Sequence, residues 1–240
     1  MHAGLIILLS VIGLIVLVLL ILFISAYRID FNKTYPRESP YYWFLVKLSV
    51  WVSVWGGRIR VNTEGTEKMP SEGTFLLVQN HRSSYDPIIT WKVFWKHNLL
   101  FVSKTENRSK PVYGRLIHRI GCLYIDREDA RSSVRTIAQA AEILKEGKYS
   151  VGIYPEGTRS KTDELLPFHN GVFRAAQKAK VPIVVTAMKG SGRIWPNWPW
   201  KRTAVTLKVL EVIPAEEAAA MRTEEIGERV RKAMEAALKD

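Results

Sequence analysis

The chain has 240 residues, of which 47% are hydrophobic, and this is enough for one domain with a sizeable core in addition to an N-terminal segment. The 35 Lys and Arg residues outnumber the 23 Asp and Glu residues, and the formal net charge of +12 favours an anionic partner such as a membrane, an acidic carrier protein or nucleic acid. The single cysteine, Cys122, excludes an internal disulfide and fits a reducing compartment.

The first predicted element is a long apolar helix at residues 3–26. It carries no formal charge, and about two dozen helical residues span roughly 36 Å, which is enough for a bilayer core. The run is too long for a secretory signal and has no Lys or Arg at its start, so we expect a retained anchor. Arg28, Lys33 and Arg37 follow it and predict a cytoplasmic location for the rest of the chain. Hydropathy leaves open whether the helix crosses the bilayer or enters one leaflet.

A second apolar helix is predicted at residues 41–55. It is too short to cross a bilayer comfortably and is crowded with Tyr and Trp, which favour the headgroup region. It is either a core helix of the soluble domain or, as we prefer, part of a membrane-associated helical module at 1–57. In the second interpretation this module seats a domain at 58–240 on, or partly in, the bilayer.

From residue 58 onward, strands and helices alternate. This order indicates an α/β domain around a mixed, largely parallel central sheet flanked by helices. Cys122 falls inside a predicted strand, which favours a packing role over a nucleophile. A Trp-rich loop at 194–200 has cationic neighbours and is either a membrane-facing edge or a packed, proline-stiffened loop. Strands are predicted at 58–63, 74–79, 99–104, 121–126, 149–154, 182–188 and 204–213, and helices at 87–96, 111–119, 129–146, 171–180 and 215–238.

The first chemical motif, Asn80-His81-Arg82-Ser83-Ser84-Tyr85-Asp86, follows the strand at 74–79. On a continuous helix, side chains five residues apart point about 140° away from each other, so the chain must turn if His81 and Asp86 are to meet. Asp86-Pro87 signals a helix start, which places His81 on a strand-to-helix turn and Asp86 at the helix cap. Asp86 could then hold one ring nitrogen while the other accepts a proton from a hydroxyl. The alternative is that Asp86 only caps the helix and His81 is a polar loop residue.

The second motif, Tyr154-Pro155-Glu156-Gly157-Thr158-Arg159-Ser160, follows the strand at 149–154. Gly157 permits backbone conformations closed to other residues, and Arg159 can present a planar fork to phosphate. The alternative is a surface turn with an ordinary salt bridge. Two more cationic side chains stand at the ends of predicted strands: Lys104 ends the strand at 99–104, and Arg127 follows the strand at 121–126. Because ligands gather beyond the carboxyl ends of strands in open α/β sheets, we expect these groups to share one rim.

Taken together, these blocks resemble the glycerolipid acyltransferase family, and most closely its 1-acyl-sn-glycerol-3-phosphate acyltransferases. The resemblance covers roughly half of the chain. This chain has Tyr154 where the family usually has Phe, and Val185-Thr186 where it often has a second proline. The four family blocks appear here as Asn80 to Asp86, Gly121-Cys122-Leu123-Tyr124-Ile125-Asp126-Arg127, Tyr154 to Ser160, and Val181-Pro182-Ile183-Val184.

The resemblance implies a reaction as well as a fold. A fatty acyl group would move from an acyl carrier protein or coenzyme A thioester to the sn-2 hydroxyl of lysophosphatidate, giving phosphatidate at the membrane. No cofactor or metal is implied. By position, His81 is the general base and Asp86 orients it. The implied substrate-binding residues are Lys104, Arg127, Glu156, Gly157, Thr158 and Arg159, of which Lys104, Arg127 and Arg159 contact the acceptor's phosphate.

Several alternatives remain open at this point. An acyl-serine route through Ser83 or Ser84 is disfavoured, because residues so near His81 have difficulty forming an in-line contact and no Gly-x-Ser-x-Gly occurs. The acceptor could be another glycerolipid, or the chain could be a non-catalytic module that binds anionic lipid. Nucleic-acid binding is disfavoured because no recognised motif is present. The sequence leaves the donor, the acyl-chain length and the oligomeric state undecided.

Overall fold

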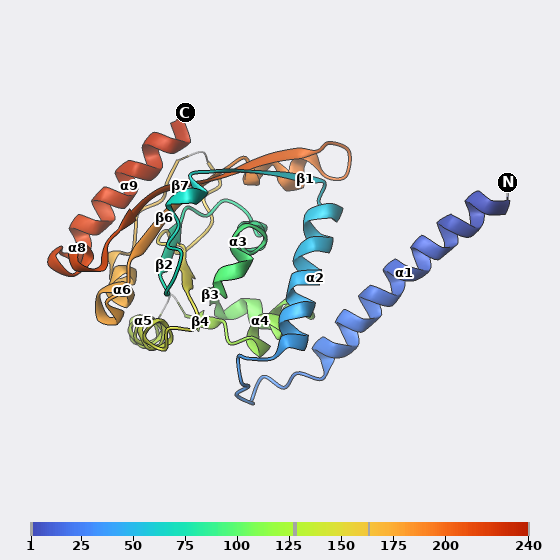
Figure 1. The fold of residues 1–240 in the computed structure, drawn as a ribbon, viewed down its shortest axis with the longest axis horizontal. Coiled ribbons are helices and arrows are strands. Elements are labelled where there is room, and N and C mark those ends of the chain that lie inside the picture. Colours follow the sequence, from blue (N-terminus) through green and yellow to red (C-terminus); the bar gives the residue numbers. More distant parts are fainter. Residues whose placement is uncertain (1, 127–128, 163, 240) are drawn as a thin grey trace. The chain divides into compact units, whose positions relative to one another are not determined.

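The structure is a computed structural model that describes residues 2–126, 129–162 and 164–239 (Figure 1). The chain divides into two compact units. The first unit comprises Met1–Ser49 with Thr105–Cys122, and the second comprises Val50–Lys104 with Leu123–Asp240. The expected domain boundary after residue 57 stays a prediction.

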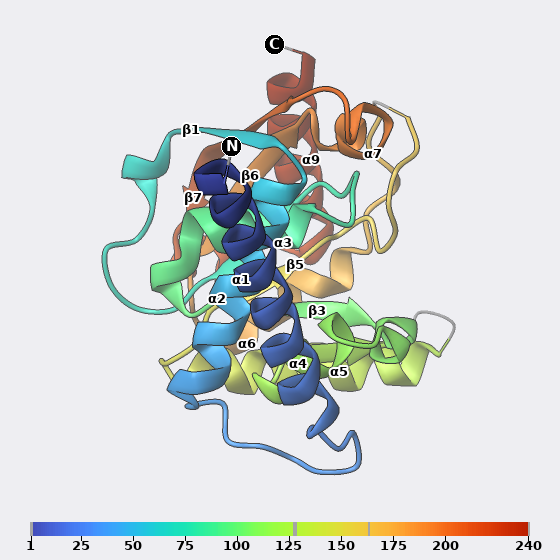
Figure 2. The same cartoon turned by 90° about the vertical axis from the view of Figure 1, so that its right-hand side faces the viewer.

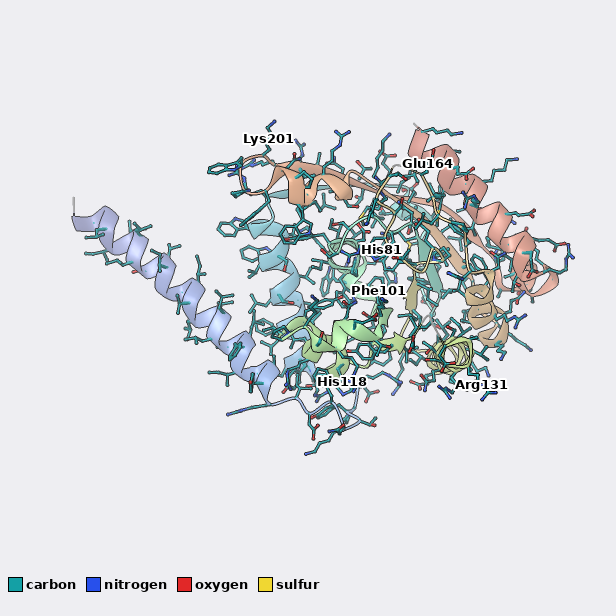
Figure 3. All side chains as sticks on the ribbon, turned by 180° about the vertical axis from the view of Figure 1, so that it is seen from behind. His81, Phe101, His118, Arg131, Glu164 and Lys201 are labelled. Atoms are coloured by element: carbon teal, nitrogen blue, oxygen red, sulfur yellow. The ribbon has the colours of Figure 1, made fainter. Side chains whose placement is uncertain are left out.

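The first unit is helical and contains the long apolar helix α1 (His2–Tyr27). By length and composition, Ala3–Tyr27 could cross a membrane. From residue 3 to residue 21 the α1 side chains are exposed except for the half-buried Val18, burial begins at Leu22, and the side chains carry almost only carbon in Figure 3. Arg115 of α4 (Tyr113–Arg119) donates a hydrogen bond to the carbonyl of Ile29 and lies over the Phe31 ring, so the chain after α1 packs on α4. The unit also contains η3 (Thr105–Ser109) and the first part of α2 (Pro40–Gly56).

The second unit is built on a seven-stranded sheet with the order β1-β7-β6-β2-β5-β3-β4. Strand β2 lies at the centre, parallel to both β5 and β6, and β3 is parallel to β5 and β4. Strand β7 is antiparallel to β6 and parallel to β1. The predicted mixed, largely parallel sheet is therefore confirmed. The strands are β1 (Ile59–Glu64), β2 (Leu76–Gln79), β3 (Leu100–Lys104), β4 (Leu123–Ile125), β5 (Val151–Ile153), β6 (Ile183–Lys189) and β7 (Thr203–Ile213).

Helices cover both faces of this sheet. In Figure 1, α5, α6 and α9 lie on one face and α3 lies on the other, which explains why all four β2 residues are buried. The remaining elements are η1 (Thr66–Lys68), α3 (Asp86–Phe94), η2 (Trp95–His97), α5 (Ala130–Lys145), η4 (Asn170–Phe173), α6 (Arg174–Ala179), η5 (Ser191–Arg193), α7 (Ile194–Asn197), α8 (Ala215–Ala220) and α9 (Thr223–Lys239).

Three local predictions were wrong in detail. The helix expected at 215–238 is two helices, because Met221 is extended and the Glu225 side chain accepts the backbone N–H of Arg222, which caps a new helix start. Strand β4 begins at Leu123, so Cys122 lies just before the strand, although it is buried as expected. The Trp-rich loop contains the short helix α7.

Candidate active site

Parallel strand direction brings the two predicted motifs to one edge of the sheet. His81 follows β2, Glu156 follows β5 and Lys104 is the last residue of β3, and these three strands are parallel. Their carboxyl ends therefore share one rim, where ligands bind in open α/β sheets. Arg127 lies outside the described residues.

His81 and Asp86 form a hydrogen-bonded pair. The distance between Nδ1 of His81 and Oδ2 of Asp86 is 2.8 Å, and Asp86 is fully buried. The same oxygen accepts the backbone N–H groups of Arg82 and Ser83 at 2.6 and 2.7 Å. Asp86 is the first residue of α3 rather than its cap, a position taken by Tyr85, and the helix dipole stabilises a carboxylate there. A carboxylate on Nδ1 leaves Nε2 as the nitrogen available to a substrate.

The main chain of His81 is held by the second motif. Its N–H donates to Oε1 of Glu156 at 2.7 Å, and its carbonyl accepts the N–H of Ser160 at 2.8 Å. The other Glu156 oxygen accepts the N–H of Leu166 at 2.9 Å. Burial raises the pKa of Glu156, while the N–H groups of Leu166 and His81 oppose this shift. Glu156 thus ties two loops together, and both of its oxygens are occupied by the main chain.

An aromatic stack covers one face of the His81 imidazole. The His81 and Tyr154 rings are 4.1 Å apart and inclined by 19°, and Tyr154 in turn stacks on Phe101 at 5.7 Å (Figure 3 labels His81 and Phe101). Gly152 of β5 makes room for this stack, because a Cβ there would lie 2.5 Å from an atom of the Phe101 ring. The stack and the Asp86 bond together fix the plane of the His81 ring.

Buried polar side chains fix the strand ends beneath the site. The Asn80 side chain exchanges two hydrogen bonds with the main chain of Met188 in β6, at 3.0 and 2.7 Å. Oε1 of Gln79 accepts hydrogen bonds from Thr90 and Thr186. These contacts join β2, β6 and α3 immediately before the turn that carries His81.

The remaining predicted residues lie on or beside the same rim. Gly157 has φ of 70°, in the left-handed region that favours glycine, and Thr158 and Arg159 are exposed on the loop beyond it. Arg159 directly precedes Ser160, whose N–H is bonded to His81, so the guanidinium-bearing loop and the imidazole-bearing turn are neighbours. Lys104 is half-buried.

The hydroxyls of Ser83 and Ser84 have other partners than the His81 ring in the part of the chain that the structure describes. Ser83 Oγ accepts the N–H of Tyr85, and Ser84 Oγ accepts the indole N–H of Trp195. Asp86 fixes the tautomer of the His81 ring, so the ring suits proton transfer from a hydroxyl. Lys104 and Arg159, at the same rim, suit the binding of a phosphate beside that hydroxyl.

Sequence reasoning missed the structural roles of Tyr154, Ser160 and Asn80. In the sequence Tyr154 stands out only as a departure from the usual Phe, and its partner Phe101 lies on a different strand. The Asn directly before the motif histidine was the one local signal for an anchoring side chain. The stack itself depends on the pairing of β3 with β5, which no local pattern reveals.

Comparison with known proteins gives a consistent result. The family model described as Acyltransferase matches residues 60–189. The chloroplastic 1-acyl-sn-glycerol-3-phosphate acyltransferase LPAT1 of Arabidopsis thaliana is 35% identical over 163 residues, covering 68% of this chain and 45% of that protein. The 1-acyl-sn-glycerol-3-phosphate acyltransferase of Saccharomyces cerevisiae is 29% identical over 184 residues, covering 75% of this chain and 59% of that protein. This chain spans about half the length of the curated relatives it matches.

A solved structure shares the fold. The crystal structure of the 1-acyl-sn-glycerophosphate acyltransferase PlsC from Thermotoga maritima aligns with a TM-score of 0.69 at 23% sequence identity. The alignment covers 91% of this chain and 86% of that one. The arrangement of the sheet and its flanking helices is therefore shared with that solved structure.

Proposed function

We propose that this chain, which belongs to the acyltransferase family, moves a fatty acyl group from a thioester donor to the sn-2 hydroxyl of lysophosphatidate and so forms phosphatidate. The observation that carries the proposal is the hydrogen-bonded pair of the partly exposed His81 and the buried Asp86, together with the bonds from the His81 main chain to the loop that bears Arg159. The binding of an anion alone would need no oriented base, so this pair favours an enzyme over a non-catalytic lipid-binding module.

The reaction requires one proton acceptor and one nucleophile. Nε2 of His81 takes the proton of the acceptor's 2-hydroxyl as that oxygen attacks the thioester carbonyl carbon. The intermediate then expels the thiolate, which takes the proton back from the imidazolium, so phosphatidate and a free thiol leave and the enzyme is regenerated. Asp86 holds the neutral ring in the tautomer with its proton on Nδ1, and it stabilises the imidazolium that forms. General-base assistance of this kind raises the rate roughly 10²–10⁴-fold.

The cations at the rim would position the acceptor. Lys104, Arg127 and Arg159 are proposed to bind its phosphate, with Gly157 and Thr158 on the same loop. Glu156 acts differently, because both of its oxygens bind main-chain N–H groups, so we assign it a positioning role in the acceptor site. Positioning of this kind contributes as much to rate as the base does, or more.

The acceptor would be presented by a membrane. The apolar helix α1, followed by Arg28, Lys33 and Arg37, supports membrane association with the catalytic unit on the cytoplasmic face. The donor would be acyl carrier protein or coenzyme A, and the net charge of +12 suits either one, because both are acidic.

The test uses the full chain in detergent micelles with lysophosphatidate and each donor in turn, and it follows phosphatidate and free thiol. The wild type should release both products in equal amounts, and His81→Ala should lose roughly 10²–10⁴-fold in kcat. His169→Ala, which alters an exposed histidine, is the matched control and should retain activity. Unchanged turnover in folded His81→Ala protein would rule the mechanism out.

Two further arms decide the alternatives. A panel of acceptors that includes glycerol 3-phosphate and other lysophospholipids shows whether lysophosphatidate is preferred. Incubation with donor alone tests the acyl-serine route, since direct transfer in a ternary complex leaves no acylated protein behind. A stoichiometric acyl-enzyme would reverse the choice of direct transfer.

A further inference from the structure

The loop between β6 and β7 exposes three large aromatic side chains. Trp195, Trp198 and Trp200 are 58%, 48% and 85% exposed. Figure 2 shows α7, which carries the first of them, at one end of the second unit and apart from α5 and α6. A concentration of exposed apolar area on a soluble surface marks an interaction site.

Positive charge surrounds these indoles. Arg193, Lys201 and Arg202 are exposed and form no salt bridge with any residue in the described ranges. Figure 3 shows Lys201 pointing away from the ribbon. We call Arg193, Trp195, Trp198, Trp200, Lys201 and Arg202 the tryptophan surface.

The loop is held in shape by hydrogen bonds. The indole N–H of Trp198 donates to the carbonyl of Gly56 at 3.0 Å, and the side chain of Asn197 donates to Thr203 at 2.9 Å. The N–H of Lys201 donates to the carbonyl of Asn197 at 2.8 Å. These hydrogen bonds fix the conformation of the loop, and in this conformation the three indole rings stay exposed to solvent.

The tryptophan surface is in direct contact with the catalytic turn. The indole N–H of Trp195 donates to Oγ of Ser84 at 3.2 Å, and its ring meets the edge of the Tyr85 ring at 5.5 Å. Both partners lie between His81 and Asp86 in the sequence. Whatever binds the tryptophan surface will therefore lie beside the turn that carries His81.

We infer that the tryptophan surface binds an anionic lipid bilayer, with its indoles at headgroup depth, and holds the His81 site against the membrane that carries the acceptor. Indole rings have an apolar body and a polar N–H and concentrate at membrane interfaces. Each Lys or Arg near an anionic leaflet adds roughly fivefold to binding. An acidic carrier protein would be attracted by the three cations, but it would leave the three indoles without an apolar partner. The inference deepens the proposed function and rests on it for the acceptor.

The direct test measures fluorescence quenching of the full chain in anionic vesicles whose acyl chains carry bromine. We expect Trp200→Phe to remove a quenched component of the wild-type emission. Trp95→Phe is the control, because Trp95 is another exposed indole, at 48%, but precedes β3, at the opposite edge of the sheet from His81. Each substitution removes the emission of one tryptophan, and the difference from the wild type gives the bromine quenching of that tryptophan. If bromine quenches Trp200 no more than Trp95, the inference is wrong. This readout needs no turnover, so it stands or falls separately from the proposed reaction.

A kinetic test addresses the charges. The double variant Lys201→Ala with Arg202→Ala should raise the apparent KM for vesicle-borne acceptor by roughly 10-fold or more, and leave the KM for a short-chain, micelle-dispersed acceptor unchanged. Lys178→Ala with Lys232→Ala removes the same charge from exposed helix positions and should leave both values unchanged. A rise in the KM for acyl carrier protein in micelles, with no effect in vesicles, would assign the surface to the donor protein and overturn the inference.

Discussion

His81 is restrained through its ring and through its main chain. Asp86 holds Nδ1, Tyr154 lies parallel to the ring, and Glu156 and Ser160 bind the amide and the carbonyl. A general base is effective only when its free nitrogen is aimed at the proton that it removes, so in the proposed mechanism each of these contacts would contribute to rate without touching the substrate.

The Tyr154 ring should matter for turnover more than its hydroxyl does. An aromatic pair contributes about 0.5–1.5 kcal/mol beyond its buried area, so Tyr154→Leu should lower kcat by roughly 2- to 12-fold with less change in the acceptor KM. Tyr154→Phe keeps the stack and should retain nearly full kcat. Steady-state kinetics in micelles provide the measurement, and equal losses in the two variants would contradict a role for the ring.

Arg159 should act on acceptor binding. A hydrogen bond to a charged group is worth about 1.5–3 kcal/mol, so Arg159→Ala should raise the acceptor KM by roughly 10- to 100-fold while kcat falls less. Lys161→Ala removes an exposed cation from the same loop and serves as the control. Titration of lysophosphatidate at saturating donor measures the effect, and an unchanged acceptor KM would remove Arg159 from the phosphate site.

Glu156 links stability to pH. Burial raises its pKa above the ordinary value of 4.5, so the folded state binds more protons than the unfolded state just above that value. The contribution of this group to stability is therefore full below about pH 4.5 and falls as pH rises through the raised pKa. The melting temperature of the wild type minus that of Glu156→Gln should decrease from about pH 4 to about pH 7. A difference that grows with pH would show that the sign is wrong.

Among the elements, β5 depends on one small residue. A methyl group at Gly152 would meet the Phe101 ring and push the stack toward His81. Overpacking of this kind costs about 1–3 kcal/mol, so Gly152→Ala should lower the melting temperature by roughly 2–12 °C and also reduce kcat. Gly171→Ala, where the added Cβ has no neighbour within 4 Å, is the control and should melt near the wild-type temperature. If Gly152→Ala kept the melting temperature and the kcat of the wild type, the Phe101–Tyr154–His81 stack would tolerate displacement.

At the level of elements, local signals predicted most of the second unit. Buried strands between polar turns, and the Asp86-Pro87 helix start, placed β2 and α3 within two residues of their observed bounds. The break at Met221 was missed because the Ala- and Glu-rich sequence on both sides favours helix, and only the Glu225 cap contradicts a continuous one. Strand order follows from long-range pairing, so the contact of β5 with β3 could not be predicted locally.

For the whole molecule, membrane retention should reside in α1. Removing residues 2–20 keeps Leu22, where burial in the first unit begins, so the truncated chain should fold but leave vesicles in a high-salt wash. Removing residues 2–6 leaves about 21 helical residues and should preserve retention. Vesicle sedimentation before and after the wash measures both forms. Salt-resistant binding of the longer truncation would place the anchor elsewhere.

The candidate site was predictable as a list of residues but not as an assembly. Polar and charged residues that follow strands indicated His81 and Arg159, because parallel strands deliver such groups to one rim, and the helix-start signal at Asp86-Pro87 indicated Asp86. The sequence could not show that both Glu156 oxygens are occupied by main-chain N–H groups, since the bonding partners are 75 and 10 residues away.

The bonds from the His81 peptide groups to residues 156 and 160 limit where the sequences of two members of this family can be joined into a hybrid chain. A crossover anywhere between residues 87 and 153 would take the imidazole from one parent and its backbone partners from another. We expect such hybrids to express well and turn over poorly, whereas exchanging segments 80–86 and 154–160 as a single cassette should transfer the activity of the donor parent intact.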